Sequence, residues 1–336
     1  MARYALTALV TWFRKEKREL PWRLDPSPYA VWVSEVMLQQ TQVKTVIPYF
    51  YRWMEVFPTL IDLAKASEEE VIKNWEGLGY YSRARQLHQG AKWCVDHTQG
   101  QLPKEPENLK KIKGIGPYTQ GALLSFAFHQ KAAAVDGNVL RVMSRLKGYS
   151  KDISLGSTKK EMEKLVLAFL PNEKPWEAME ALIELGALIC TKKPTCHKCP
   201  LINQCQAFLQ GKTEKLPVKK KGTQTLSITR YVVMLESEGD ILVKKNEPGK
   251  IMAGLWEFPY FENALPTHFS GILLQNMTPQ ETVTHTFTRY RATLFPYFQQ
   301  ISKKIHPEGF TWIPMDQLKQ LPFSSGHRKL LKYLVG

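Results

Sequence analysis

A Gly-x-Gly turn stands between two helical stretches in the sequence Leu109-Lys110-Lys111-Ile112-Lys113-Gly114-Ile115-Gly116-Pro117-Tyr118-Thr119. Glycine permits a tight turn that leaves backbone amides exposed. At the start of the helix that follows, those amides and the helix dipole suit a phosphate oxygen. The alternative is a plain interhelical turn, because a lone Gly-x-Gly motif is a weak signal. Its place in the basic part of the chain, about seventy residues before four clustered cysteines, favours phosphate binding.

Four of the five cysteines, Cys190, Cys196, Cys199 and Cys205, form a C-x5-C-x2-C-x5-C pattern within sixteen residues. Without a secretion signal, such crowding favours metal binding over disulfide bonds. Four thiolates so close repel one another unless a metal neutralises them, and both zinc and a [4Fe-4S] cluster take four sulfurs. A single compact loop, without two separate knuckles, favours the cluster. Cys94 stands apart from this group.

The chain has 336 residues and a formal net charge of +15, of which +12 falls in residues 1–225 and +3 in residues 226–336. The length is sufficient for two ordinary domains. The charge indicates a polyanionic partner, nucleic acid or an anionic membrane surface. No run of about 18 apolar residues is present to span a bilayer, and Met1-Ala2-Arg3-Tyr4 is too polar to begin a secretory signal. We therefore expect a cytoplasmic, nucleoid-associated protein.

Two domains joined by a linker are predicted from a change in the hydrophobic pattern. Residues 1–209 repeat apolar side chains at helical spacing. Residues 210–225 include Lys219-Lys220-Lys221 and lack an apolar face, so we expect a basic linker. Residues 226–336 contain β-branched and aromatic runs that predict an α+β domain. The clearest strands are expected at 227–234, 240–243 and 292–295.

Several motifs together resemble those of the helix-hairpin-helix, iron-sulfur DNA glycosylase superfamily, which contains endonuclease III and the adenine glycosylases. The cysteine run follows Glu184-Leu185-Gly186-Ala187, as in that superfamily's iron-sulfur loop, and residues 109–119 match its hairpin. Leu20-Pro21-Trp22-Arg23 and Met37-Leu38-Gln39-Gln40-Thr41-Gln42-Val43 are similar to motifs of the adenine-specific branch. The superfamily has six residues between its first two cysteines and this chain has five, so the loop at 190–205 must be tighter by one residue.

The resemblance assigns the chemistry to three side chains. Glu35, set among apolar neighbours, matches the acid that protonates the adenine ring, and burial would raise its pKa. Asp136 matches the aspartate that stabilises the sugar cation or bonds to it, and its alternative role is to cap the next helix. Tyr118 stands where bifunctional relatives carry a Schiff-base lysine. Hydrolysis by water without an efficient lyase step is therefore expected, with Tyr118 orienting the water or the carboxylate.

Further residues match positions that contact DNA or the flipped base in this family. An adenine can enter a pocket only if it leaves the duplex, and another group must then fill the gap. Gln40 and Tyr80 match residues that insert beside the opposing base, although Tyr80 could instead be a buried core aromatic. The other matches are the pocket residues Trp22, Arg23 and Glu180, the hairpin glycines Gly114 and Gly116, and Asn138.

Residues 226–336 resemble the oxidised-guanine recognition domain of this family, which is related in fold to the Nudix hydrolases. No Nudix box with its metal-binding glutamates occurs between Tyr231 and Gly336, so binding is expected rather than nucleotide hydrolysis. The stretch His285-Thr286-Phe287-Thr288-Arg289 aligns with the Phe-Ser-His loop that reads 8-oxoguanine. Thr288 retains the hydroxyl of the serine it replaces, whereas Arg289 replaces a histidine with a cation suited to a phosphate.

These motifs identify the chain as a member of the adenine-specific branch. The resemblance implies a monofunctional hydrolase of base excision repair that removes adenine mispaired with 8-oxoguanine or guanine from double-stranded DNA. It also implies a [4Fe-4S] cluster, a monomer, and no membrane partner. One alternative is a lyase-competent glycosylase for oxidised pyrimidines, which Tyr118 in place of lysine disfavours. The other is a non-catalytic damage binder, which would not need both Glu35 and Asp136.

Overall fold

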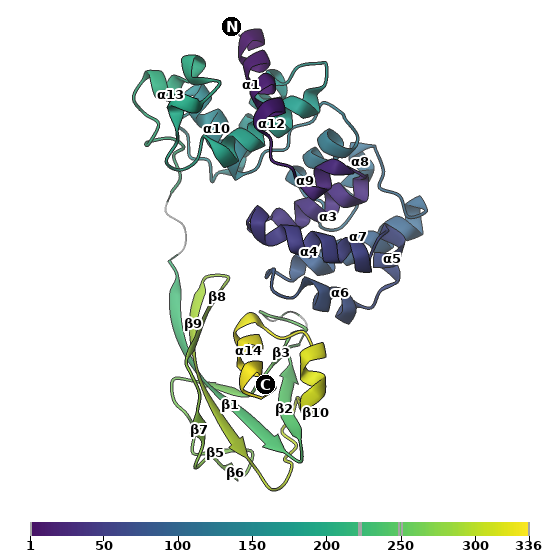
Figure 1. The fold of residues 1–336 in the computed structure, drawn as a ribbon, viewed down its shortest axis with the longest axis vertical. Helices are drawn as coiled ribbons and strands as arrows, with labels where there is room; N and C mark the ends of the chain where they lie inside the picture. Colours follow the sequence, from purple (N-terminus) through teal and green to yellow (C-terminus); the bar gives the residue numbers. More distant parts are fainter. Residues whose placement is uncertain (1, 221–223, 248, 250, 335–336) are drawn as a thin grey trace. The chain divides into compact units, whose positions relative to one another are not determined.

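The computed structural model describes residues 2–220, 224–247, 249 and 251–334 (Figure 1). Its contacts divide the described chain into two compact units. The first unit comprises residues 1–65 and 86–221, and the second comprises residues 66–85 and 222–336.

The division after residue 221 falls within the predicted linker, of which residues 221–223 lie outside the described part. Residues 66–85 belong to the second unit although they lie far from it in sequence. Nothing in their helical pattern distinguishes them from their neighbours, so this placement is visible only in the structure.

The first unit is helical, as predicted, and its described residues form no strand. The cysteine loop adds two 3₁₀ turns, Cys196–Lys198 and Ile202–Gln204. Among the described residues, no helix combines the length and apolar character needed to cross a membrane. The helices are α1 (Ala2–Glu16), α2 (Pro21–Leu24), α3 (Pro28–Leu38), α4 (Val43–Val56), α5 (Leu60–Lys65), α7 (Ser82–Thr98, which begins in the second unit), α8 (Pro106–Leu109), α9 (Pro117–Ala122), α10 (Gly137–Lys147), α11 (Gly156–Phe169), α12 (Pro175–Leu188) and α13 (Gln206–Leu209).

Helix α3 is buried on all sides. Ser27 caps its N-terminus by accepting a hydrogen bond from the Ala30 amide at 3.2 Å, and Pro28 suits the first helical position. Every residue from Tyr29 to Met37 is buried. A carboxyl group on such a helix, that of Glu35, is therefore removed from water, which favours its neutral form.

An apolar core is shared by four helices of the first unit, α1, α10, α11 and α12. Leu9, Met143, Met162 and Leu182, one from each helix, are fully buried in it. Helix α10 ends where Gly148 adopts a left-handed backbone with φ +64°. This core fixes the N-terminus of α10 beside α12.

The predicted helix-hairpin-helix is formed by α8, the turn that follows it, and α9. Gly114 has φ +89°, which favours glycine, and a Cβ atom there would lie 2.8 Å from the Cβ of Gln86. Gly116 is exposed and precedes the first residue of α9. Helix α9 continues into a π-helical turn at Leu123–Ala127.

The second unit is built on a mixed sheet with strand order β10-β2-β1-β9-β7 (Figure 1). Strand β3 also pairs with β2, β4 with β1, and β8 with β9. The long central strands β1 and β9 run parallel. The strands are β1 (Leu226–Ser237), β2 (Asp240–Lys245), β3 (Trp256–Glu257), β4 (Tyr260–Glu262), β7 (Thr278–Pro279), β8 (Val283–Phe287), β9 (Tyr290–Gln300) and β10 (Phe310–Pro314), with β5 (His268–Phe269) and β6 (Ile272–Leu273) in a separate pair.

The three strands predicted from sequence lie within β1, β2 and β9. Helix α14 (Ser325–Leu330) packs against β8, and Leu330 joins the apolar core of the sheet with Val232 and Leu294. Helix α6 (Glu68–Trp75) and the 3₁₀ turns Met315–Gln320 and Leu331–Tyr333 complete this unit. The prediction of a helical domain followed by an α+β domain is thus confirmed.

Candidate active site and cysteine cluster

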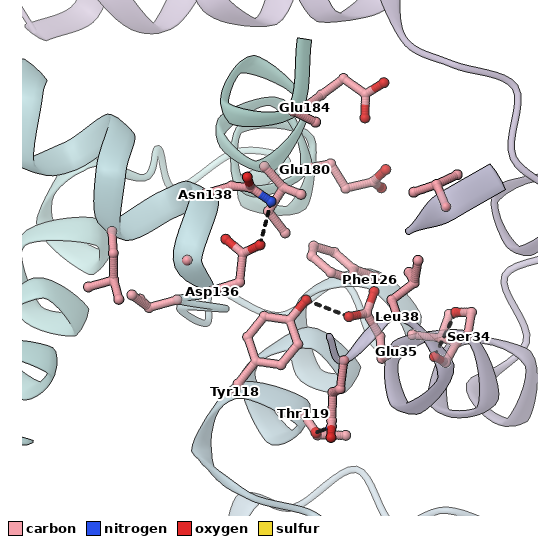
Figure 2. A pocket seen from close by; sticks show the side chains of 18 of the residues that line it. Ser34, Glu35, Leu38, Tyr118, Thr119, Phe126, Asp136, Asn138, Glu180 and Glu184 are labelled. Atoms are coloured by element: carbon pink, nitrogen blue, oxygen red, sulfur yellow. Dashed lines mark hydrogen bonds between the residues drawn. The ribbon is translucent and has the colours of Figure 1, made fainter. Parts of the chain in front are cut away.

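A cleft of about 1390 Å³ lies within the first unit (Figure 2). Its walls come from α3, the hairpin, the N-terminal end of α10 and one side of α12, with further residues from α1, α2 and α11. Tyr80, Phe287 and Thr288 belong to the second unit. The residues predicted from sequence that line the cleft are Trp22, Arg23, Glu35, Gln40, Gly114, Gly116, Tyr118, Asp136, Asn138 and Glu180.

Glu35 is the buried carboxyl group of this cleft, with 6% of its surface exposed. The Tyr118 hydroxyl donates a hydrogen bond to Glu35 Oε2 at 2.5 Å (Figure 2). Burial raises the pKa of Glu35 to about 7, the Tyr118 hydrogen bond opposes that rise, and the nearby Asp136 carboxylate adds to it. The side chain therefore carries a transferable proton near neutral pH, as the sequence analysis expects of an acid.

Asp136 caps helix α10 and also lines the cleft. Its carboxylate accepts hydrogen bonds from the Val139 amide and from the Asn138 side chain, each at 2.7 Å. Burial raises the pKa of Asp136, and these two bonds oppose the rise. In Figure 2 the carboxylate lies beside the Tyr118 side chain. The capping role and a place in the cleft are thus compatible.

A chain of hydrogen bonds runs from Asp136 toward the cysteine loop. Asn138 donates to Asp136 and accepts from Arg141 Nη2 at 2.8 Å. Arg141 also donates to the carbonyl oxygens of Gly186 and Cys190, at 2.7 Å each. No role for Arg141 is expected from the sequence motifs. Its spacing of three residues from Asn138 on one helix is the signal that could have suggested the contact.

Two arginines and two glutamates form an ionic group at one wall of the cleft. Arg23 pairs with Glu180 at 2.8 Å and with Glu184 at 3.0 Å, and Arg18 pairs with Glu184 at 2.7 Å. Glu184 is fully buried and its pKa lies below the usual value, because the two guanidinium groups outweigh the effect of burial. Sequence reasoning missed Arg18 and Glu184. Arg23 is therefore held in place from both sides, which fixes its position beside Glu180.

Trp22 and the opposing-base candidates differ in exposure. Trp22 is buried and packs edge-on against Phe50, with ring centroids 5.4 Å apart. Tyr80 is 45% exposed, so the alternative that it is a buried core aromatic is wrong. Gln40, Tyr80 and Thr288 all have left-handed backbones, with φ values of +59°, +48° and +47°. Such conformations are uncommon outside glycine, and sequence reasoning cannot detect them.

Thr288 lies at the tip of the hairpin that joins β8 to β9, between the paired residues Phe287 and Tyr290. Both Thr288 and Arg289 are exposed. Arg289 Nη2 donates to the Tyr290 hydroxyl at 3.3 Å. The predicted recognition segment is therefore a tight turn that presents the Thr288 side chain to solvent.

The four clustered cysteines, Cys190, Cys196, Cys199 and Cys205, line one small cavity beside Arg145. Arg145 is 3% exposed and donates to Cys190 Sγ at 3.4 Å and to the Thr191 carbonyl oxygen at 2.6 Å. The shortened spacing of the loop still places all four side chains on this one cavity. This set of sulfur donors, with a guanidinium group beside it, fits a metal cluster that carries negative charge on its thiolates.

Comparisons with known proteins agree with this arrangement. Residues 33–171 match the family described as HhH-GPD superfamily base excision DNA repair protein, and residues 230–333 match the NUDIX domain family. The adenine DNA glycosylase of Homo sapiens is 32% identical over 98% of this chain and 73% of its own length. That of Mus musculus is 44% identical over 96% of this chain and 76% of its own length.

The chain belongs to the adenine DNA glycosylase family. Its fold also resembles endonuclease III in a trapped covalent intermediate with DNA, at 27% identity and a TM-score of 0.54, over 62% of this chain and 96% of that one. The family and the enzyme class expected from the sequence, a DNA glycosylase of base excision repair, are thereby confirmed.

We expect Glu35 to titrate near pH 7 instead of near 4.5, because burial disfavours its charged form. Tyr118→Phe should raise this pKa further, since the variant loses the hydrogen bond that favours the carboxylate. Carbon-13 NMR of labelled glutamate carboxyl groups, with Glu35→Gln to assign the signal, measures both values. A Glu35 signal that titrates with the surface glutamates would contradict the expectation.

Gly186→Ala should weaken the contact between α12 and α10. A Cβ atom at Gly186 would lie 2.6 Å from the Asn138 Cβ and 3.1 Å from its Cα. Forcing the helices apart should lower the free energy of unfolding by about 1–3 kcal/mol. Thermal unfolding measures the change, and Gly156→Ala is the matched control because its Cβ meets nothing within 4 Å. Equal stability of the two variants would show that the contact is not tight.

Proposed function

We propose that this chain removes adenine mispaired with 8-oxoguanine or guanine from double-stranded DNA and leaves an abasic site. The observation that carries the proposal is the Glu35 carboxyl group, whose pKa is raised to about 7 and which lies in one cleft with the Asp136 carboxylate. An acid and an anion are the two groups that cleavage of an N-glycosidic bond requires.

In the proposed reaction, Glu35 donates its proton to a ring nitrogen of the flipped adenine. The bond between C1′ and the adenine nitrogen then breaks, and its electron pair leaves with the base. Asp136 faces the resulting sugar cation and stabilises it, either as an ion pair or through a transient covalent bond. Water adds to C1′, and its proton returns to a carboxylate. No co-reactant other than water is needed.

Tyr118 supports hydrolysis over lyase chemistry. A lyase step needs an amine that forms a Schiff base with the sugar, and a tyrosine hydroxyl cannot supply one. Its hydroxyl instead donates to Glu35. We assign Tyr118 the role of orienting the Glu35 carboxyl group, so that the proton faces the base.

The cleft has features that suit double-stranded DNA. The exposed turn at Gly114 and Gly116 opens onto it, where backbone amides can bind a phosphate oxygen. Exposed lysines provide sequence-independent attraction to the backbone. The similar fold of endonuclease III was solved in a covalent intermediate with DNA. The exposed lysines that line the cleft are Lys17, Lys159, Lys160 and Lys219.

We assign recognition of the base opposite adenine to the exposed residues with left-handed backbones, Gln40, Tyr80 and Thr288. Gln40 and Tyr80 would fill the space that the flipped adenine leaves. Thr288, at the hairpin tip beside Phe287, would offer its hydroxyl to 8-oxoguanine. Trp22, Arg23 and Glu180 would contact the adenine itself, with Arg23 fixed by its two glutamate partners.

We infer that the four cysteines hold a [4Fe-4S] cluster. All four line one cavity. The cysteines lie in a single compact loop without two separate knuckles, which favours a cluster over zinc. Arg145 would partly neutralise the thiolate bound at Cys190. When bound, the cluster would hold the loop at 190–205 in shape.

Glu35→Gln should abolish adenine release while it leaves DNA binding intact, because the amide keeps the shape of the acid but has no proton to transfer. Single-turnover excision from duplexes with adenine opposite 8-oxoguanine, guanine or thymine, together with gel-shift affinity, separates the two effects. The wild-type chain should act on the two mispairs and spare the pair with thymine. Substantial excision by Glu35→Gln would place the acid elsewhere.

Cys199→Ser should remove iron, visible absorbance and DNA affinity together, since three cysteines are a poor ligand set for the cluster. Cys94→Ser is the matched control, because Cys94 is buried outside the cysteine cavity. Iron and zinc analysis of the purified wild-type chain, with its absorption spectrum, checks the cofactor. One zinc ion and no iron per chain would overturn the cluster assignment.

A further inference from the structure

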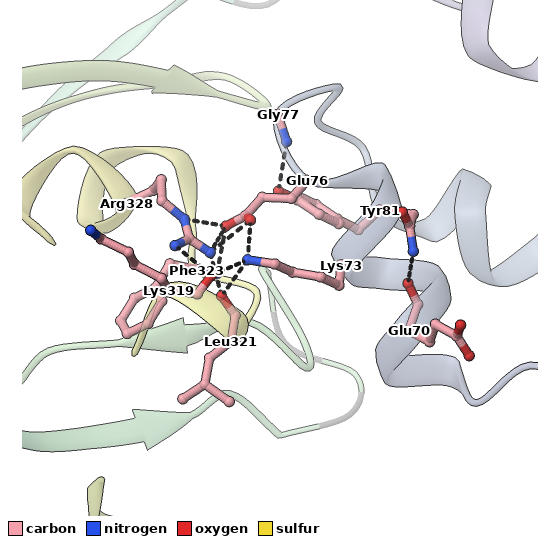
Figure 3. A network of polar contacts seen from close by, with 10 residues as sticks. Glu70, Lys73, Glu76, Gly77, Tyr81, Lys319, Leu321, Phe323 and Arg328 are labelled. Carbon is pink, nitrogen blue, oxygen red and sulfur yellow. Dashed lines mark hydrogen bonds and ion pairs between the residues drawn. The ribbon is translucent and has the colours of Figure 1, made fainter. Parts of the chain in front are cut away.

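The Glu76 carboxylate joins two distant parts of the sequence within the second unit (Figure 3). It follows α6 and accepts hydrogen bonds from the Phe323 amide at 2.9 Å and from Lys73 Nζ at 2.9 Å. The guanidinium group of Arg328, on α14, binds it in a fork, with Nε and Nη2 each donating at 2.6 Å. Such paired, charge-assisted bonds are directional as well as strong.

Lys73 and Arg328, which bind Glu76, also form hydrogen bonds with the loop at residues 319–323. Lys73 Nζ also donates to the carbonyl oxygens of Lys319 and Leu321, at 2.6 Å and 3.2 Å. Arg328 donates to the Leu321 carbonyl oxygen as well. The cations on both sides of the carboxylate thus hold residues 319–323 against the end of α6 (Figure 3).

This network differs from an ordinary surface ion pair. The Glu76 side chain is only 14% exposed and that of Arg328 is 26% exposed. By contrast, Glu69 and Lys245 also join α6 to the sheet, but they are 3.4 Å apart and half exposed. Exposed pairs of that kind contribute little. The Glu69 pair is therefore a matched comparison within the same unit.

Glu76 leads directly into the turn that presents Tyr80. Trp75 Nε1 and Arg83 Nη2 each donate to the Gly79 carbonyl oxygen at 3.0 Å. The Arg83 guanidinium also lies 5.6 Å from the centre of the Tyr80 ring. Trp75 and Arg83 thus connect the two ends of the turn, and Glu76, which lies between them in sequence, attaches the turn to Phe323 and Arg328.

Arg328 lies on α14, which connects the Glu76 network to the hairpin that carries Thr288. Helix α14 packs against β8, and a Cβ atom at Gly326 would lie 2.1 Å from His285 Nδ1, so helix and strand are in close contact there. His285 is two residues before Phe287 on the same strand. A continuous set of contacts therefore connects the Tyr80 turn to the Thr288 hairpin.

We propose that Glu76 and Arg328 are positioning residues that hold the Tyr80 turn and the Thr288 hairpin in one body. The base opposite adenine is then read by both elements together, so that this pair determines the preference for 8-oxoguanine over guanine. The inference rests on the proposed function of the cleft. It adds a specificity role for two residues that touch neither the base nor the reacting atoms.

The test compares single-turnover excision of adenine opposite 8-oxoguanine and opposite guanine. Glu76→Gln should lower the ratio of the two rates several-fold, mainly through the 8-oxoguanine duplex, and leave the rate opposite guanine within about twofold. The control Glu69→Gln should leave the ratio unchanged. In a Tyr80→Ala background, Glu76→Gln should have no further effect on the ratio, because it acts through the same side chain.

Hydrogen exchange of the amides at 77–83 supplies a readout that is independent of catalysis. Glu76→Gln should speed exchange there, and Glu69→Gln should not. If Glu76→Gln fails to fold, Arg328→Lys is tested in its place. Lysine keeps the positive charge but cannot make the paired hydrogen bonds of the guanidinium group. Arg328→Lys should therefore lower the rate ratio and speed exchange at 77–83, each to a smaller degree.

Additive effects of Glu76→Gln and Tyr80→Ala, equal losses on both duplexes, or unchanged exchange would each overturn the proposal. A wild-type chain that releases no adenine would instead refute the proposed function. In that case the exchange data would still decide whether Glu76 holds the turn.

Discussion

The contact between α10 and α12 is the packing on which the site is built. Gly186 leaves room for Asn138 at this contact, and Arg141 bonds to the carbonyl oxygens of Gly186 and Cys190 across it. The N-terminus of α10, with Asp136, is thereby fixed on the cleft, and the first cysteine of the loop is fixed behind it. A shift of either helix would therefore move the Asp136 carboxylate and Cys190 together.

Two buried carboxyl groups of the cleft, Glu35 and Glu184, have opposite pKa shifts because their surroundings differ. Glu35 is surrounded by apolar side chains with one hydroxyl partner, so burial dominates and its pKa rises. Glu184 is buried as deeply but receives Arg18 and Arg23, so its pKa falls. Burial alone therefore does not fix the direction of the pKa shift, which depends on whether a guanidinium group is paired with the carboxyl group.

Helix α6 belongs to the second unit, although it lies between helices of the first unit in the sequence. Residues 66–85 bring Tyr80 into the same body as the sheet and its hairpin. The polar network at Glu76 supplies the directional bonds, and Phe323, next to it in the loop, is fully buried in the apolar core of the sheet. The residues to which we assign recognition of the opposing base, Tyr80 and Thr288, thus belong to the unit with the Nudix-like sheet, while the groups assigned to base release lie on the helical unit.

The sequence by itself determined the two domain types, the hairpin, the four cysteines, and the acids Glu35 and Asp136, because each has a local signature in spacing, turn residues or apolar neighbours. It also determined the membership in the family. Only the tertiary structure decided which distant residues contact one another. Arg18 pairs with Glu184, Arg141 bonds to Cys190, and Arg328 pairs with Glu76. Those partners are 49 to 252 residues apart, and no local pattern specifies a pairing at such separation. The left-handed backbones of Gln40, Tyr80 and Thr288 were equally hidden, because these residue types have no strong intrinsic preference for that conformation.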